Sequence, residues 1–229
     1  MMFNHLSNKD IIDILGYDDL ETVTTSECRK YKLPGIDKSY PSVTTVLSIL
    51  SADHIEAWKK KVGEEEAAKI SYRASSRGTA VHSIIEKYVE NDPDYKSGFM
   101  PNVIESFQSV KSILDSRVGR IFGQELALYS DHLELAGRAD CIAEFDGVLS
   151  IIDYKTSRKS KKKSWIENYF IQETAYAIMF EERTGIPINN LVTIIAVDNE
   201  DSQVFIEKRD NWTKKLIDTI EQYKQGKKI

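Results

Sequence analysis

The chain has 229 residues, of which 41% are hydrophobic and 29% are charged, and its formal net charge is −5. This length can bury one sizeable core and need not divide into two domains. The negative net charge excludes a generally basic coat protein for nucleic acid, so any affinity for nucleic acid must be local. Two cysteines, Cys28 and Cys141, are too few for a disulfide scaffold and suit a reducing compartment. No apolar run approaches the length of a membrane span.

The first half of the sequence is predicted to be mainly helical. Apolar periodicity and capping signals indicate helices at residues 10–15, 43–49, 52–61, 64–89 and 102–117. Ser42 is the expected N-cap of the second helix, and Gly78 interrupts the pattern of the fourth. Residues 17–41 are turn-rich and are predicted to form a loop or a short hairpin.

The second half is predicted to contain a mixed sheet flanked by helices. Strand patterns occur at residues 124–129, 134–144, 148–154, 191–197 and 203–208. A helix at 164–183 separates the third strand from the fourth, and a helix capped by Asn211 ends the chain. The order predicts an α/β fold in a single domain. Its expected parts are a mainly helical segment at about 1–118, a core at about 119–210 and a C-terminal helix at 211–229.

The most informative segment is a hairpin that carries an acid on each arm. Asp146-Gly147 is a strong signal for a two-residue turn. In that register Asp140 and Asp153 face each other, with Cβ atoms about 4.5–5.5 Å apart. Like charges so placed destabilise a sheet, so we expect a hard divalent cation to compensate them. Lys155 points to the same face as Asp153, and the three groups suit metal-assisted attack on a phosphodiester.

The alternative is a polar edge hairpin whose charges are solvated. Ile151 and Ile152 argue against it, because an apolar run that leads into Asp153 indicates a buried or half-buried strand. A basic run then extends from Lys155 to Lys163, with six basic residues in nine. Such runs are usually solvated loops, but one that starts at a candidate active-site lysine favours phosphate binding.

Five short motifs occur in the order that is typical of one family. Asp140, the segment 152–157 (Ile-Asp-Tyr-Lys-Thr-Ser) and the pair Gln172 and Tyr176 resemble the PD-(D/E)XK nuclease superfamily. Residues 77–82 (Arg-Gly-Thr-Ala-Val-His) match the Gly-x-x-x-His element of its RecB-like exonuclease branch. Residues 41–47 and Trp58 are similar to the mitochondrial genome maintenance exonuclease group, which also has phage members. The resemblance runs from about residue 40 to about residue 180.

The resemblance implies a restriction-endonuclease-like fold with an N-terminal helical cover over the active site. It also implies a DNA exonuclease that requires Mg²⁺ or Mn²⁺ and acts on single-stranded DNA from a free end. Two cysteines are too few for the four-cysteine iron–sulfur cluster that some RecB-like nucleases carry, so no such cluster is expected. The alternatives are a structure-specific or double-strand endonuclease on the same core, or an inactive nucleic-acid-binding module.

The expected catalytic residues are Asp140, Asp153 and Lys155, with Lys155 orienting or helping to deprotonate the attacking water. The resemblance adds His82 and the carbonyl of Tyr154 to the two aspartates as metal ligands. A packed histidine is the alternative reading of His82.

Two glutamates are candidates for the surroundings of the metal. Glu86 is one helical turn beyond His82, and Glu125 starts the strand before the hairpin. Each could equally be an ordinary surface charge. Arg138, opposite Lys155 in the hairpin register, could contact the phosphate or lower the pKa of the lysine.

Contacts to nucleic acid are expected from basic, hydroxyl and amide side chains around these residues. They are Arg73, Arg77, Arg138, Thr156, Ser157, Arg158, Lys159, Gln172 and Tyr176. For Gln172 and Tyr176 the alternative is a surface glutamine and a core tyrosine. The N-terminal residues lack the signals of a secretory or mitochondrial leader. We therefore expect a protein of the bacterial or virus-infected cytoplasm, mitochondrial only if a presequence is missing.

Overall fold

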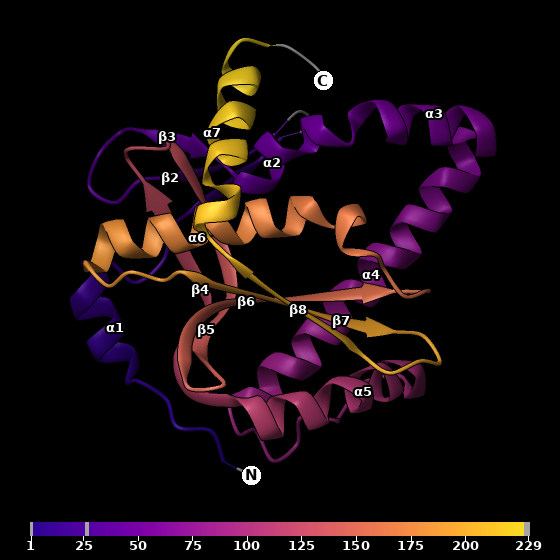
Figure 1. The fold of residues 1–229 in the computed structure, drawn as a ribbon, viewed down its shortest axis with the longest axis horizontal. Coiled ribbons are helices and arrows are strands. Elements are labelled where there is room, and N and C mark those ends of the chain that lie inside the picture. Colours follow the sequence, from indigo (N-terminus) through magenta and orange to yellow (C-terminus); the bar gives the residue numbers. More distant parts are fainter. Residues whose placement is uncertain (1, 26–27, 227–229) are drawn as a thin grey trace.

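The structure is a computed structural model that describes residues 2–25 and 28–226. In these residues a five-stranded sheet has the order β4-β5-β6-β7-β8 (Figure 1). The strands are β4 (Val118–Ser130), β5 (Leu135–Phe145), β6 (Val148–Ser157), β7 (Asn190–Val197) and β8 (Gln203–Lys208). Only the β6–β7 pair is parallel in this sheet, and α6 (Glu167–Thr184) makes the connection between those two strands. The predicted mixed sheet flanked by helices is therefore confirmed.

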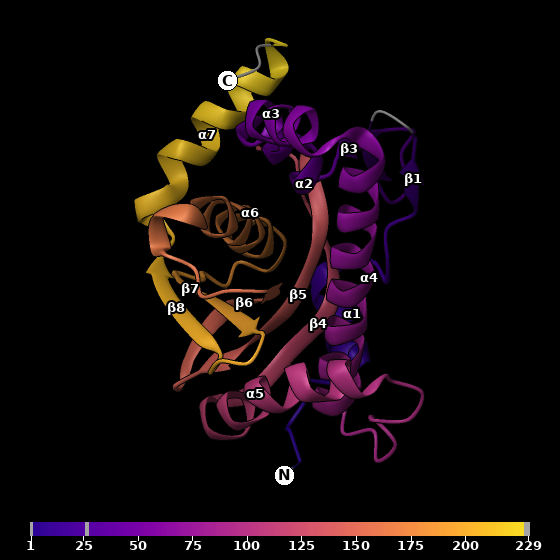
Figure 2. The same ribbon diagram turned by 90° about the vertical axis from the view of Figure 1, so that its right-hand side faces the viewer.

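Helices cover both faces of the sheet. On one face α6 packs over the strands together with α1 (Asn8–Leu15), α2 (Val43–Leu47) and α7 (Asp210–Lys224). On the other face lie α4 (Glu64–Val89) and α5 (Pro101–Arg117). Figure 2 shows α4 and α6 on opposite sides of β4 and β5. Every residue of β7 is buried, as expected for a strand covered on both faces.

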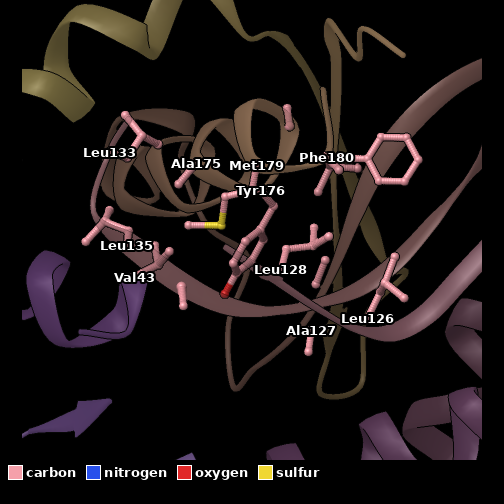
Figure 3. Close-up of a cluster of buried hydrophobic side chains, with 14 of the residues drawn as sticks. Val43, Leu126, Ala127, Leu128, Leu133, Leu135, Ala175, Tyr176, Met179 and Phe180 are labelled. Atoms are coloured by element: carbon pink, nitrogen blue, oxygen red, sulfur yellow. The ribbon is translucent and has the colours of Figure 1, made fainter. Parts of the chain in front are cut away.

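Strand alternation assigns each site residue to one of these faces. Ile151 of β6 packs on the α6 face, whereas Ile152 and Tyr154 pack on the α4–α5 face. Because side chains alternate along a strand, Asp153 points toward α6. Figure 3 shows the packing beside it, where Tyr176 and Phe180 of α6 lie over Leu128 of β4.

The N-terminal part is less purely helical than predicted. Residues 17–41, expected to form a loop or a short hairpin, contain a three-stranded antiparallel sheet of β1 (Thr22–Thr24), β2 (Arg29–Lys32) and β3 (Ser39–Pro41). Tyr31 and Tyr40 pair across β2 and β3, and both are buried in the α6-face core. Their burial holds strands that are too short to show a pattern in the sequence.

The remaining elements follow the prediction with local differences. Ser42 caps α2 as expected, and a 3-10 helix, η1 (Ser48–Leu50), continues it. Gly78 does not interrupt α4, which is continuous. Asn211 lies inside the first turn of α7 and is not its cap, because the helix begins at Asp210 after Arg209. A second 3-10 helix, η2 (Lys163–Trp165), precedes α6.

One helical arm stands away from the core. α3 (Ala52–Val62) has no buried residue, and in the first half of α4 only Ala67 is buried. Figure 1 shows α3 and the start of α4 projecting beyond the sheet. Within the described ranges, no helix combines the length and the apolar character that a membrane crossing requires.

Candidate metal centre and nucleic-acid interface

The β5–β6 hairpin has the turn that its sequence predicts. Asp146 and Gly147 have φ values of 52° and 77°, as a two-residue turn of the I′ type requires. The carboxylate of Asp146 accepts hydrogen bonds from the Arg117 guanidinium, at 3.0 Å from Nε. The ladder runs from the pair Phe145–Val148 to the pair Cys141–Ile152. The next step in the same register is Asp140 and Asp153, so the predicted register is confirmed up to the step before the two acids.

Beyond that point the two strands are joined through a side chain. The backbone N–H of Tyr154 donates a hydrogen bond to a carboxylate oxygen of Asp140, at 2.9 Å. The carbonyl of Tyr154, expected to bind metal, lies 2.5 Å from Nε2 of His82. A carbonyl can only accept, so this contact places the proton on Nε2 and leaves Nδ1 toward Asp140, 3.6 Å from its carboxylate.

Asp153 is almost completely buried, with 1% of its surface exposed. Its carboxylate forms an ion pair with the Lys155 ammonium and accepts a hydrogen bond from Nε2 of Gln172, at 3.1 Å. Burial raises the pKa of Asp153 to about 6, although Lys155 opposes the shift. Burial alone would lower the pKa of Lys155, but the charges of Asp153 and Asp140 outweigh it and raise that pKa. Lys155, whose side chain is 21% exposed, is thus a partly buried cation beside Asp153.

Glu125 lies nearer the centre than the sequence indicates. It stands between the pairs Gln124–Cys141 and Leu126–Ala139, at the same step as Asp140 on the neighbouring strand. Its φ of 46° is unusual for a strand residue with a side chain, and such strained positions are concentrated at functional sites. No local sequence signal reveals this conformation.

Three side chains form a group that could hold a metal ion. Ligand atoms of His82, Glu125 and Asp140 lie within 4.8 Å of one another. Burial, then the charges of Asp140 and Glu86, raises the pKa of Glu125 to about 7. Burial also raises the pKa of Glu86, one turn further along α4. Two carboxylates and an imidazole suit Mg²⁺ or Mn²⁺, so the residues present fit a divalent cation.

The group lies in a cavity of about 530 Å³. His82, Glu86, Glu125, Asp140, Gln172 and Tyr176 are among the residues that line it. The opposite wall includes Thr22, Arg29 and Tyr31 of the small sheet and Thr44 of α2. The expected helical cover over the site is therefore built partly from a β-sheet.

Gly137 allows α6 to approach β5 closely. A Cβ atom at this position would lie 2.7 Å from Cε1 of Tyr176. The hydroxyl of Tyr176 is in turn 3.4 Å from Nε2 of Gln172, the amide that contacts Asp153. Tyr176 is 3% exposed, so the core position considered for it is correct, while Gln172 reaches the acid rather than the surface. Sequence analysis did not single out Gly137, although a glycine two residues after the start of a strand is a signal for close backbone approach.

A second cavity, of about 1320 Å³, follows the first along α4. Residues 70–77 of α4 line it, and residues 79–86 line the metal cavity. It gathers most of the predicted nucleic-acid contacts, namely Arg73, Arg77, Thr156, Ser157, Arg158 and Lys159. Arg77 is bound to Asp198, at 2.8 Å, so that one positive charge is already paired. Glu105, Glu200 and Asp201 also line the cavity, which makes its charge mixed rather than uniformly basic.

The β5–β6 ladder ends before the step at which Arg138 would lie opposite Lys155, and on its other edge Arg138 pairs with Ala127 of β4. Its guanidinium donates to the Asp19 carboxylate at 2.6 Å and to the Glu125 carbonyl at 2.5 Å. The suggested effect on the pKa of Lys155 is therefore not supported, but Arg138 does line the metal cavity.

Sequence comparison relates the chain to known exonucleases. The chain is 26% identical over 212 residues to mitochondrial genome maintenance exonuclease 1 of Xenopus tropicalis, covering 82% of this chain and 58% of that protein. It is 27% identical over 217 residues to the Homo sapiens protein of the same name, covering 86% of this chain and 62% of the relative. The chain thus spans about 60% of the length of these relatives. A crystal structure from Eubacterium rectale aligns with a TM-score of 0.40 at 14% identity, over 65% of this chain and 64% of that one, too weakly to bear on function.

The sequence profile of one family covers more than half of the chain. Residues 98–228 match the PD-(D/E)XK nuclease superfamily, a range that includes Asp140, Asp153, Lys155 and Gln172. The chain belongs to the PD-(D/E)XK nuclease superfamily.

Proposed function

We propose that this protein is a divalent-metal-dependent exonuclease that hydrolyses phosphodiester bonds of single-stranded DNA from a free end. The observation that carries the proposal is the group His82, Glu125 and Asp140 beside the ion pair of Lys155 with the buried Asp153. Because the chain belongs to a nuclease superfamily, we take phosphodiester hydrolysis as the reaction of this group of charged residues. We propose cleavage from strand ends because the relatives are named exonucleases.

A divalent cation would be held by Asp140, Asp153, Glu125 and His82, with the Tyr154 carbonyl as a further oxygen ligand. Bound there, it supplies Lewis-acid stabilisation of charge at the phosphate and lowers the pKa of a water molecule. The carbonyl of Tyr154 is now the acceptor for His82, so the imidazole must turn if both groups are to face one ion.

The protein's own groups have separate tasks around the phosphate. Lys155 is a fixed cation, held by Asp153, that can orient the attacking water and stabilise negative charge developing on the phosphate. Gln172 donates to one oxygen of Asp153 and so fixes the orientation of that carboxylate. The hydroxyl of Tyr176 accepts a hydrogen bond from the same Gln172 amide and so helps to fix its position.

The second cavity is proposed to hold the strand on its way to the metal. Its basic residues Arg73, Arg158 and Lys159 can contact phosphates, while Thr156 and Ser157 can donate hydrogen bonds. Binding should then weaken as salt is raised, because each phosphate contact displaces a counterion.

End-labelled linear and circular single strands, incubated with Mg²⁺ or Mn²⁺, test the proposal. We expect the linear strand to be degraded and the circular strand to persist. Cleavage of the circle would favour the endonuclease alternative, and no cleavage of either with both metals would refute a nuclease. Asp153→Ala and Lys155→Ala should each abolish cleavage, with Lys214→Ala, at an exposed lysine of α7, as the matched control. Retained cleavage in both active-site variants would refute the proposed site.

A further inference from the structure

An exposed tryptophan lies in the segment that joins β6, which carries Lys155, to α6, which carries Gln172. Trp165, the last residue of η2, is 61% exposed. Its neighbour Ile166 is fully buried, so this part of the chain is anchored in the core while the indole faces out. A single exposed aromatic residue is not unusual in itself. The charged and aromatic residues near it in the chain suggest a role for Trp165.

One cation lies over Trp165, and an aromatic ring four residues further along the chain contacts the active-site lysine. The ammonium of Lys162 lies over the indole, 5.4 Å from the ring centroid. Four residues further along, the ring of half-buried Tyr169 lies 5.1 Å from Nζ of Lys155. Tyr169 and Gln172 are three residues apart in α6 and so lie on neighbouring positions of one helix face. One aromatic side chain therefore lies at the active-site lysine, and an exposed one lies four residues before it in the chain.

The segment that carries Trp165 is fixed at several points. The backbone N–H of Lys161 donates to the Gln203 side chain at 2.7 Å, and the amide of Gln203 donates back to the Lys161 carbonyl at 3.1 Å. Lys163 forms an ion pair with Glu207 of β8. A ring held in place loses little entropy when a ligand stacks on it, so the exposed indole is pre-organised for binding.

We infer that Trp165 and Tyr169 form a stacking platform for the bases of an unpaired nucleic-acid strand whose reacting phosphate lies at Lys155. The inference rests on the proposed function for the position of that phosphate. Trp165 ends η2 and Tyr169 lies in the first turn of α6, so the four residue steps between them span at most about 14 Å, or about four nucleotide steps at ~3.4 Å each. The base on Trp165 therefore belongs to a nucleotide within about four positions of the cleaved bond. A paired base presents no free face there, so the platform selects single strands.

Binding without cleavage tests the platform directly. In a Trp58→Phe, Trp212→Phe variant, Trp165 is the remaining tryptophan, and its fluorescence should be quenched by a short single-stranded oligonucleotide in EDTA. A Trp58→Phe, Trp165→Phe variant, which retains the partly buried Trp212, should show little change. Absence of quenching in the first variant at saturating oligonucleotide would overturn the inference.

Kinetics and modified substrates give an independent measurement in the otherwise intact chain. Trp165→Ala should raise KM for a linear single strand about 5- to 150-fold, with kcat changed by less than about threefold, because stacking contributes that range of affinity per base. Trp165→Phe should recover most of the affinity. In a series of strands with one abasic nucleotide at each of the four positions next to the cleaved bond, one position should weaken binding by the unmodified protein but not by Trp165→Ala.

The outcomes separate this inference from the proposed function. If the unmodified protein cleaves single strands and Trp165→Ala has an unchanged KM, the platform is wrong and the nuclease stands. If no cleavage occurs with either metal but quenching persists, the nuclease is wrong and the platform stands. If neither cleavage nor quenching is seen, both are wrong.

Discussion

Glu173 is a buried acid whose protonation should make the free energy of unfolding depend on pH. It is completely buried in α6, next to Gln172 in the chain, and one of its oxygens accepts a hydrogen bond from the Thr193 hydroxyl. Its other oxygen, Oε2, has no hydrogen-bond partner among the described residues. Burial, reinforced by the charge of Asp153, raises the pKa of Glu173 well above its usual range. The folded protein therefore keeps this side chain neutral where the unfolded chain ionises it.

The sign of the pH effect follows from proton counting. Above the ordinary pKa of glutamic acid, about 4.3, the unfolded chain loses a proton that the folded protein retains. The free energy of unfolding must then fall as pH rises, by about 1.4 kcal/mol per pH unit, until the pH reaches the folded-state pKa. Glu173→Gln replaces the neutral acid by a neutral amide of the same shape and removes this dependence. Within that window the difference in the free energy of unfolding should grow by about 1.4 kcal/mol for each pH unit, in favour of the variant.

Urea unfolding followed by circular dichroism at several pH values measures the effect. The other titrating groups are common to both proteins, so the difference between the two curves isolates Glu173. Glu221→Gln, at an exposed glutamate of α7, is the matched control and should run parallel to the unmodified protein. Curves for Glu173→Gln and the unmodified protein that stay parallel from pH 5 to pH 8 would show that Glu173 ionises normally and would refute the reasoning.

Three further predictions concern glycines and the metal group. Gly137→Ala should lower the free energy of unfolding in urea by about 1–3 kcal/mol and should lower kcat, because the new methyl group collides with Tyr176, which contacts Gln172. A variant with unchanged stability and activity would contradict this prediction. Gly147→Ala should lower the free energy of unfolding by about 1–2 kcal/mol, since φ is +77° there. Gly78→Ala inside α4 should leave that free energy unchanged or raise it slightly. Mn²⁺ at 100 times its Kd should stabilise the protein by about 2.7 kcal/mol, seen as a higher Tm, and Asp140→Asn should abolish the gain; an equal gain in that variant would place the ion elsewhere.

Much of the central sheet could be predicted because its signals are local. The Asp146-Gly147 turn fixes the hairpin register, and the register determines that Asp140 and Asp153 share a step. The apolar run before Asp153 correctly indicates a buried strand, since Ile151 and Ile152 are fully buried. Turn chemistry and alternation operate within a few residues, so a single sequence is sufficient to reveal them.

The parts that escaped prediction depend on distant residues. The side chain of Arg138 is held by Asp19, which is 119 positions away in the chain, so hairpin geometry alone does not reveal this partner. The strands β1 to β3 have only three or four residues each, and they are stabilised by burial of Tyr31 and Tyr40 rather than by a repeated pattern. The position of Glu125 depends on a backbone conformation that a glutamate rarely adopts.

Three neighbouring strands therefore place an acid at one level of the sheet: Glu125 on β4, Asp140 on β5 and Asp153 on β6. Each opposed pair would be destabilising if both members were charged. The protein relieves this repulsion in two ways, with the cation of Lys155 beside Asp153 and with raised pKa values at Glu125 and Asp153 that favour protonation. A divalent cation held by these carboxylates would reduce the repulsion further. It would compete with protons for Glu125 and Asp153, so the affinity for the metal should rise as pH is raised through the pKa values of about 6 and 7.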